Sequence, residues 1–380
     1  MNFDLSDEQV LLREAARDAF SRVRTVEAAR DALEGGELPD LWPTATTAGW
    51  TGLLISEEHG GAGLSAIDAM LVAAEAGRVL ASVPLLGHLP ATAIVNAGGL
   101  DEETLRKLAA GELRAAYVPA RPGDDVDSAW TVDPRGGRRR AAAPTVVRGE
   151  DGLATVSGSV AWVPDAVGAD VLVVVGVEDG SGTPVAVAFG PGADGVSVEA
   201  ATGIYDATRP LGHVTLDGAC GRVLAADEEQ LRRAWFLAHT LIAAESLGAV
   251  EECLERSVAY AKERYTFGRA IGSYQAVKHA LTEVLRRQEN TRSLLYYAGW
   301  AYVDKPDEFA AAASAARACG GAALDFAARE VISVHGGIGA TWEHDAPLFF
   351  RRAQLSRRLL GGTGDAVDRL AGEMLAGAAA

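Results

Sequence analysis

The sequence predicts an α+β protein made of a helical part, a central β part and a helical bundle, in that order. Three observations support this prediction. Apolar residues recur at helical spacing through the first third of the 380 residues. Short strand signals punctuated by Gly, Pro and Asp fill residues 153–223, as in a compact β-sandwich or barrel. Long Ala- and Leu-rich stretches follow, and we expect domains at residues 1–112, 113–225 and 226–380.

The N-terminal part begins with a helix that we predict over residues 6–23. Ser6 is a suitable N-cap residue, and Gln9 stands three positions later, as a capping box requires. Further helices are predicted over residues 38–50, 65–80 and 101–110.

The central part is predicted to begin with a loop. Residues 121–150 are rich in Gly, Pro and Arg, and they include three consecutive arginines at 138–140. Those arginines could bind phosphate, but the composition favours a solvated loop. Beyond it, Val171–Val175 predicts a buried strand, and Pro184–Phe189 alternates as a half-buried strand does.

The C-terminal part has the pattern of an antiparallel bundle with short connecting turns. We predict its helices over residues 228–262, 273–303, 306–332 and 345–359.

Composition and charge narrow the class of protein. The chain is 48% hydrophobic and 23% charged, which excludes a disordered chain. Its net charge is 35 − 52 = −17, which argues against nucleic acid as the main partner. Three widely spaced cysteines predict neither disulfides nor a zinc site and fit a reducing cytoplasm. No signal peptide and no membrane-spanning run is expected, so we predict a cytoplasmic protein.

Several familiar catalytic motifs are absent from the sequence. The seven histidines show no metal-ligand spacing, so we expect no metal. There is no G-x-S-x-G elbow and no phosphate-binding P-loop. The chain also lacks a GxGxxG motif in the strand–turn–helix setting that dinucleotide binding needs.

Two glycine-containing segments between long helices carry more information. Arg264–Gln275 combines flexible backbone with several hydrogen-bond donors, and such a turn can hold a pyrophosphate. A solvated helix–helix turn is the alternative. Ser333–His344 contains paired glycines, which allow close backbone approach either to a ligand or to another helix.

These two segments, Arg-x-Thr-Phe-Gly…Gln and His-Gly-Gly-x-Gly, resemble the acyl-CoA dehydrogenase family. Gly49–Leu53, Glu57–Gly63 and Asp206–Arg209 also resemble family motifs, so the likeness covers essentially the whole chain. It implies an N-terminal helical domain, a central β-domain and a C-terminal four-helix bundle. Members usually assemble as a dimer of dimers.

The resemblance also implies a cofactor, a reaction and partners. FAD would lie between the β-domain and the bundle, with its adenosine end reaching a neighbouring subunit. The reaction would be α,β-dehydrogenation of an acyl thioester carried by CoA or an acyl-carrier protein, with an electron acceptor flavoprotein taking the electrons. By resemblance the cofactor-binding residues are Trp162, Arg264, Thr266, Phe267, Tyr274, Gln275, Ser333, Gly336, Gly337 and Thr363.

The catalytic base that the family places in a Glu-Gly-Thr triplet is missing. Gly361 occupies that position in this chain. The alternative position on an earlier bundle helix falls near Ala238, again without a carboxylate. Glu245 is the nearest acid in that helix and is a weak candidate, because a helical Glu is usually solvated or packed.

Other departures affect the flavin and thioester ends. Pro164 replaces a Thr at the flavin edge and lacks a backbone N–H. Ser333 replaces a Gln, His239 stands where an Arg is expected, and Tyr117–Asp125 keeps only the acidic end of a flavin-contacting loop. The chain thus resembles bacterial members whose heteromers contain a subunit without the Glu.

Three functions remain open at this point. The chain is an acyl-CoA dehydrogenase, alone or as half of a heteromer; or a non-catalytic partner; or an enzyme of another flavin reaction, such as a monooxygenase. Without a carboxylate at position 361, we do not expect the chain alone to dehydrogenate acyl thioesters at rates typical of the family.

Overall fold

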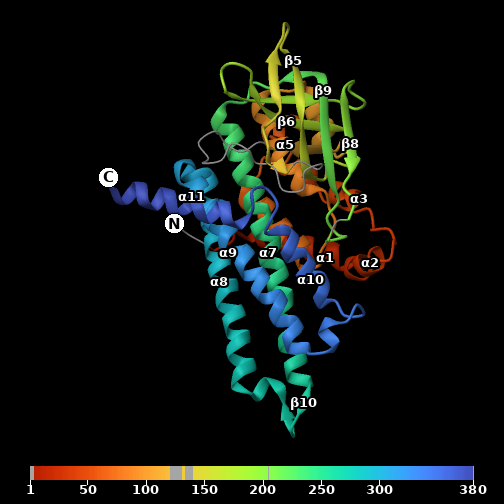
Figure 1. The fold of residues 1–380 in the computed structure, drawn as a ribbon, viewed down its shortest axis with the longest axis vertical. Helices are drawn as coiled ribbons and strands as arrows, with labels where there is room; N and C mark the ends of the chain where they lie inside the picture. Colours follow the sequence, from red (N-terminus) through yellow and green to blue (C-terminus); the bar gives the residue numbers. More distant parts are fainter. Residues whose placement is uncertain (1–3, 120–130, 133–139, 204, 380) are drawn as a thin grey trace.

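The computed structural model describes residues 4–119, 131–132, 140–203 and 205–379. Helices of the N-terminal part lie beside a β-barrel, and long helices extend away from the barrel (Figure 1). The predicted loop positions 121–130 and the arginines at 138–140 fall outside the described residues, apart from Arg140.

The N-terminal helices are α1 (Asp7–Ser21), α2 (Thr25–Ala32), α3 (Trp42–Thr47), α4 (Ala66–Arg78), α5 (Leu85–Gly98) and α6 (Glu102–Ala109), with 3₁₀ turns at Trp50–Gly52 and Glu57–His59. The Ser6–Gln9 capping box is confirmed: each side chain bonds the other residue's backbone N–H. The helix predicted over 38–50 is too long, because Gly49 adopts φ +72° and ends it.

The barrel is a seven-stranded sheet with the order β1-β6-β4-β5-β9-β7, closed by pairing of β6 with β7, while β8 pairs with β9. Its strands are β1 (Ala115–Val118), β4 (Thr145–Arg148), β5 (Leu153–Pro164), β6 (Val171–Glu178), β7 (Pro184–Phe189), β8 (Val196–Ala200) and β9 (Leu211–Val223), and a separate short pair joins β2 (Thr131–Val132) to β3 (Arg140–Ala141).

Two predictions about the barrel need correction. The segment predicted as a loop over 121–150 contains β4, which pairs with both β5 and β6. The alternation predicted for β7 is also wrong, since all its residues after Pro184 are buried. Strand β7 lies between β6 and β9 and contacts α7, so it has no solvent face.

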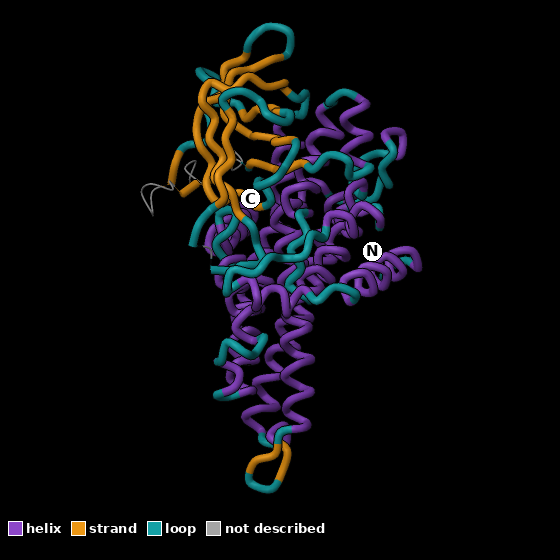
Figure 2. Tube along the Cα trace, turned by 90° about the vertical axis from the view of Figure 1, so that its right-hand side faces the viewer, coloured by secondary structure: helices purple, strands orange, loops and turns teal. Residues whose placement is uncertain are grey.

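The C-terminal part contains α7 (Glu228–Glu263), α8 (Gln275–Asp304), α9 (Pro306–His335), α10 (Ala346–Ser356) and α11 (Gly362–Ala379). Between α7 and α8 the chain forms a small hairpin of β10 (Tyr265–Thr266) and β11 (Arg269–Ala270). Figure 2 shows this hairpin at the end of the bundle that is remote from the barrel.

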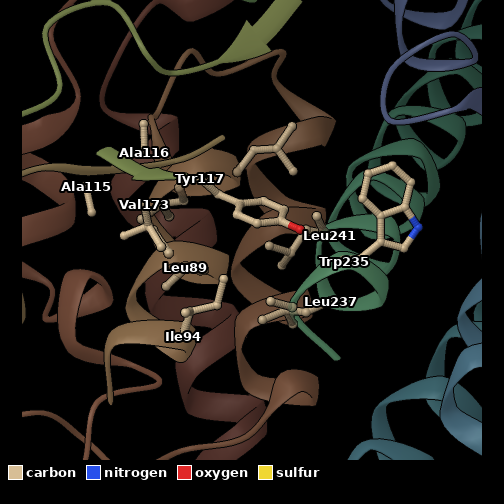
Figure 3. Packing of buried hydrophobic residues seen from close by; sticks show 14 of the residues in the cluster. Leu89, Ile94, Ala115, Ala116, Tyr117, Val173, Trp235, Leu237 and Leu241 are labelled. Atoms are coloured by element: carbon tan, nitrogen blue, oxygen red, sulfur yellow. The ribbon is translucent and has the colours of Figure 1, made fainter. Parts of the chain in front are cut away.

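One hydrophobic cluster spans all three parts, and a second cluster packs α2 against the bundle helices. At the junction shown in Figure 3, the ring of Tyr117 on β1 lies among side chains of α5 and α7, including Leu237 and Leu241. The Tyr117 side chain is buried, and its hydroxyl has no hydrogen-bond partner among the described residues. Within the described part of the chain, no helix is long and apolar enough to cross a membrane.

Candidate functional site

A buried cluster of ion pairs joins the barrel to the bundle. Arg352 on α10 donates from Nε to Asp206 at 2.6 Å and from Nη2 to the Thr208 hydroxyl at 2.5 Å. Arg209 pairs with Glu245 on α7, and Arg352 Nη1 lies 3.9 Å from the same carboxylate. All five residues are buried. The segment before β9 is therefore fixed against two bundle helices.

Electrostatics in this cluster favour the charged forms. Burial acts to raise the pKa of Asp206, but the charge of Arg352 and the hydrogen bonds from Thr208 and Arg352 outweigh it, so the pKa is below its usual value. The carboxylate of Glu245 is committed to Arg209. The structure thus gives Glu245 a role in joining two parts of the chain.

The end of β5 forms a wall next to this cluster. The pairing of β5 with β9 shifts register between Val160 and Val163, and Trp162 in this bulge has φ +60°. The Trp162 N–H donates to His213 Nδ1 at 3.4 Å, and the two rings meet edge to face with centroids 4.8 Å apart. Pro164 ends the strand opposite Leu211.

Asp165 follows Pro164 and is buried. Its Oδ2 accepts a hydrogen bond from the Gly87 N–H, near the start of α5, at 2.7 Å. Burial raises the pKa of Asp165 to about 6, even though the nearby charge of Arg209 acts to lower it. Asp165 thus adds another titratable group beside the ion-pair cluster.

The turn from Leu359 to Gly362, which we call the Gly361 turn, is held from inside the bundle. His239 on α7 contacts the Leu360 carbonyl through Nε2 at 3.0 Å. Arg317 on α9 donates from Nη2 to the carbonyls of Ser356 and Leu359, the latter at 3.1 Å. Because a carbonyl oxygen can only accept, His239 Nε2 carries the proton in this contact.

The backbone of the Gly361 turn is unusual. Leu360, Gly361 and Gly362 have φ of +51°, +81° and +83° in succession. A left-handed Leu costs about 1–2 kcal/mol, so the surrounding contacts must impose this conformation. Two backbone hydrogen bonds close the turn, from the Gly362 N–H to the Leu359 carbonyl at 3.0 Å and from the Thr363 N–H to the Arg357 carbonyl at 3.1 Å.

Thr363 is the second residue of α11, directly after this turn. Its methyl group packs on α9, where a Cβ added to Gly321 would approach it to 2.2 Å. The Arg317 guanidinium lies beside the same place and is fully buried. Burial lowers the pKa of Arg317 to about 10, and no carboxylate among the described residues pairs with it directly.

The hairpin predicted to contact a cofactor lies at the tip of the bundle, far from α11, which follows the Gly361 turn (Figure 1). Phe267 is 93% exposed with φ +52°, and Arg264 and Gln275 are also exposed. The Tyr274 hydroxyl donates to the Thr266 carbonyl at 2.9 Å, which closes the hairpin on the start of α8. These groups project outward rather than toward the chain's own barrel.

The glycine pair lies next to the base of this hairpin. The ring of His335, at the end of α9, stacks on Tyr260 of α7 with centroids 4.3 Å apart. Gly336 has φ +65°, and neither it nor Gly337 has a heavy atom within 4 Å of an added Cβ. Ser333 is exposed on the preceding turn of α9. The structure therefore brings the two predicted motifs together.

These donors fit the pyrophosphate end of a dinucleotide. An exposed guanidinium at Arg264, an amide at the start of α8 and open backbone at Gly336–Gly337 are the groups that phosphate oxygens accept from. The predicted flavin edge is poorer in donors, because Pro164 has no N–H and the backbone N–H of Trp162 is used by His213. In the described residues, no group of three or more His, Cys, Asp or Glu side chains could hold a metal.

Comparison with solved structures defines the class of fold. Butyryl-CoA dehydrogenase from Megasphaera elsdenii superposes with a TM-score of 0.85 at 20% identity, over 99% of this chain and 100% of that one. The chain thus has the acyl-CoA dehydrogenase fold, with N-terminal helices, a central β-barrel and a C-terminal helical domain. PigA, solved with FAD and proline, gives a TM-score of 0.84 at 21% identity and covers 98% and 99%.

Sequence comparison shows the family. Residues 6–120 match the model "Acyl-CoA dehydrogenase, N-terminal domain" and residues 237–374 match "Acyl-CoA dehydrogenase, C-terminal domain". Acyl-CoA dehydrogenase IpdE2 of Mycolicibacterium smegmatis is 30% identical over 97% of this chain and 100% of its own length. A variant of the steroid ACAD Tcur3481-Tcur3483 has a TM-score of 0.85 at 28% identity, covering 98% and 99%. The chain belongs to the acyl-CoA dehydrogenase family of oxidoreductases.

Sequence reasoning missed the buried side chains that hold this site together. The sequence did not mark Arg317 and Arg352 as buried, because an Arg in an Ala-rich helix has no fixed environment: on α9, Arg317 is buried and Arg329 is exposed. His239 was noted only as a replaced Arg, and its contact with Leu360 joins residues 121 positions apart. Such pairing has no local sequence pattern.

Proposed function

We propose that the protein acts in FAD-dependent α,β-dehydrogenation of an acyl thioester, within an oligomer in which each hairpin serves a neighbouring subunit. The observation that carries this proposal is the hairpin itself. An almost fully exposed Phe267, flanked by exposed Arg264 and Gln275, is a costly arrangement for an isolated chain and suits a contact made in trans.

In this reaction FAD supplies the acceptor for the substrate's β-hydrogen. The chain's own groups would have other tasks. The N–H of Gly361 would donate to the thioester carbonyl and stabilise the charge that develops there. The ion-pair cluster of Asp206, Arg209, Glu245 and Arg352 would keep the barrel wall fixed against the bundle. An electron acceptor flavoprotein would then take up the electrons.

One observation favours a second function, that of a partner subunit which completes another chain's cofactor site. Gly361 offers no proton acceptor, and Glu245 is engaged by Arg209. Such a subunit would keep the hairpin while its own chemistry is lost. The comparison with a steroid ACAD whose name joins two proteins supports a heteromeric arrangement.

Anaerobic mixing with a panel of acyl-CoAs separates these functions. Flavin bleaching by the chain alone supports a self-sufficient dehydrogenase, and bleaching only with a partner co-purified from the native host supports a heteromer. Oxygen consumption with reduced flavin, without bleaching by any acyl-CoA, would indicate a monooxygenase-type reaction. A folded protein that light scattering shows to be strictly monomeric, in every combination, would refute the contact in trans.

The role of the hairpin has its own test. Arg264→Ala should weaken FAD retention roughly 10- to 100-fold, because a charge-assisted hydrogen bond contributes about 1.5–3 kcal/mol. Arg286→Ala is the matched control, since Arg286 is an exposed α8 residue paired with Glu283. Equal flavin content in the two variants, measured with the partner present, would contradict the role of Arg264.

A further inference from the structure

Asp165 joins the end of β5 to the start of α5. Its Oδ2 accepts the Gly87 N–H at 2.7 Å, across 78 positions of the sequence. The Asp165 backbone has φ +61°, a left-handed conformation that residues other than Gly rarely adopt. Gly87 is constrained as well, because a Cβ there would lie 2.9 Å from the Asp165 Cβ and 3.0 Å from the Pro164 carbonyl oxygen. Both backbones are therefore shaped for this one contact.

The contact lies in the first turn of a helix. Helix α5 begins at Leu85, and Pro84 before it makes no side-chain cap. The N–H groups of a first turn have no partner inside their own helix, and the helix dipole favours a negative charge beside them. Asp165 thus caps α5 from a distant part of the chain, and the strength of this cap depends on the charge of its carboxylate.

Asp165 is the surplus carboxylate beside the buried ion-pair cluster. Arg209 pairs with Glu245, and Arg352 pairs with Asp206. The carboxylate of Asp165 instead accepts from a neutral backbone N–H. Three carboxylates thus lie with two guanidiniums, and the charge of Asp165 is the one without an equal counter-charge.

Groups on several elements act on this carboxylate. Burial raises the pKa of Asp165 to about 6, and the charge of Glu245 on α7 acts in the same direction. The charge of Arg209, the Gly87 N–H on α5 and the charge of Arg114 before β1 act to lower the pKa. Asp165 is therefore ionised at neutral pH and becomes neutral in mildly acidic solution.

The ionised form of Asp165 makes the fold less stable. Because its folded pKa is above the unfolded value near 3.9, the free energy of unfolding falls as pH rises from about 3.9 to about 6 and stays lower at neutral pH. An Asn could accept from Gly87 without this cost. A buried charge that costs stability, directly after a segment predicted to contact a cofactor, indicates a functional role rather than a packing role.

We propose that Asp165 is a positioning residue for FAD, whose ionised carboxylate holds the end of β5 against α5. The proposal rests on the proposed function, in which Trp162 and Pro164 form the flavin edge. On one side this edge is held by β9, where Trp162 contacts His213 and Pro164 lies opposite Leu211. Asp165 holds the other side. When its carboxylate is neutral, the cap on α5 weakens and the flavin edge loses a fixed position.

The test compares the FAD affinity of Asp165→Asn with that of the unmutated protein, each in the assembly that retains FAD. Asn keeps an acceptor for the Gly87 N–H but carries no charge. At about pH 7.5 we expect the variant to bind FAD roughly 10-fold more weakly, which is the difference between a charge-assisted and a neutral hydrogen bond. At about pH 5 the two proteins should bind FAD nearly equally, because Asp165 is then protonated. Flavin fluorescence reports the dissociation constant without any acyl-CoA.

Thermal unfolding separates positioning from a merely structural role. At neutral pH, Asp165→Asn should unfold at no lower a temperature than the unmutated protein, although it holds FAD less tightly. Asp165→Ala, which removes the acceptor, should lose both stability and FAD affinity. Asp170→Asn is the matched control, since the Asp170 Oδ2 also accepts a backbone N–H, from Arg114 at 2.8 Å, but is only half-buried. It should leave FAD affinity unchanged at both pH values.

The outcomes distinguish this proposal from the proposed function. Equal FAD affinity of Asp165→Asn and the unmutated protein at neutral pH, or the same loss of affinity at both pH values, would overturn the role of Asp165. So would an Asn variant that unfolds as early as Asp165→Ala. FAD affinity that follows the charge of Asp165, without bleaching by any acyl-CoA, would support this role and overturn dehydrogenation. Absence of FAD from every assembly would overturn both.

Discussion

Replacement of Arg352 by Met should destabilise the protein strongly. In the structure, Arg352 bonds Asp206 at 2.6 Å and the Thr208 hydroxyl at 2.5 Å, and all three side chains are buried. Met fills a similar volume but leaves the Asp206 carboxylate buried without its counter-charge. Breaking one partner of a buried pair costs about 3–5 kcal/mol.

The assay is thermal unfolding, with urea unfolding as a second measurement. A loss of 3–5 kcal/mol corresponds to roughly 6–10 °C in the apparent melting temperature, at about 2 °C per kcal/mol for a large chain. Arg351→Met is the matched control on the same helix. Arg351 is only half-buried and lies over the Tyr205 ring at 4.7 Å, a contact that contributes about 0.5–1 kcal/mol.

The change of stability with pH gives a further test, because the pKa of Asp206 determines its direction. The pKa of Asp206 is depressed in the folded protein, so its stabilising contribution is present above the unfolded value near 3.9 and is lost as pH falls through the folded value. Arg352→Met should weaken that acid dependence, and Asp206→Asn added to it should recover part of the stability. The reasoning is refuted if Arg352→Met unfolds at the same temperature as Arg351→Met.

Three other predictions concern single positions. Tyr117→Phe should raise the free energy of unfolding by about 1–3 kcal/mol, because it removes a buried hydroxyl without a partner; a loss in urea unfolding would contradict this. Burial lowers the pKa of His88 to about 4, so about 3 kcal/mol of stability present above pH 6.5 should be lost as pH falls to 4. Stability curves of His88→Gln should be flatter over that range. Gly361→Glu and Gly361→Ala should each lower the free energy of unfolding by about 1–2 kcal/mol, because residue 361 has φ +81°. Only the Glu variant should raise the rate at which acyl-CoA bleaches the flavin.

Local sequence signals predicted the fold well where one segment decides its own structure. The Ser6–Gln9 capping box and the long helix α7 follow from short-range patterns. Helix α5 was not predicted, because it is buried on nearly every side and has no polar face to mark its period. Helix α11 was missed too, since Gly362 and Gly364 at its start indicate a loop. The proposed boundaries after residues 112 and 225 fall between α6 and β1 and between β9 and α7.

In the candidate site, too, some features could be predicted from the sequence and others could not. The glycine-containing segments Arg264–Gln275 and Ser333–His344 stood out because each is a short motif between long helices, whereas Gly361 was singled out only by the resemblance to the family. The contacts of Arg352 with Asp206 and of Arg209 with Glu245 could not be predicted, because they join residues 146 and 36 positions apart. Helical periodicity shows which residues of α7 are buried, but not which partner each one meets.

The Gly361 turn has a costly backbone shape. Leu360 at φ +51° is strained, and Gly at that position would relieve the strain at once. Arg317 is fully buried, and the burial that lowers its pKa to about 10 disfavours its charge. A turn with no task would not need two buried cationic or basic side chains on its carbonyl oxygens. Those contacts fix the carbonyl oxygens of Leu359 and Leu360 toward the bundle helices, so we expect the rigid turn to serve the proposed substrate site.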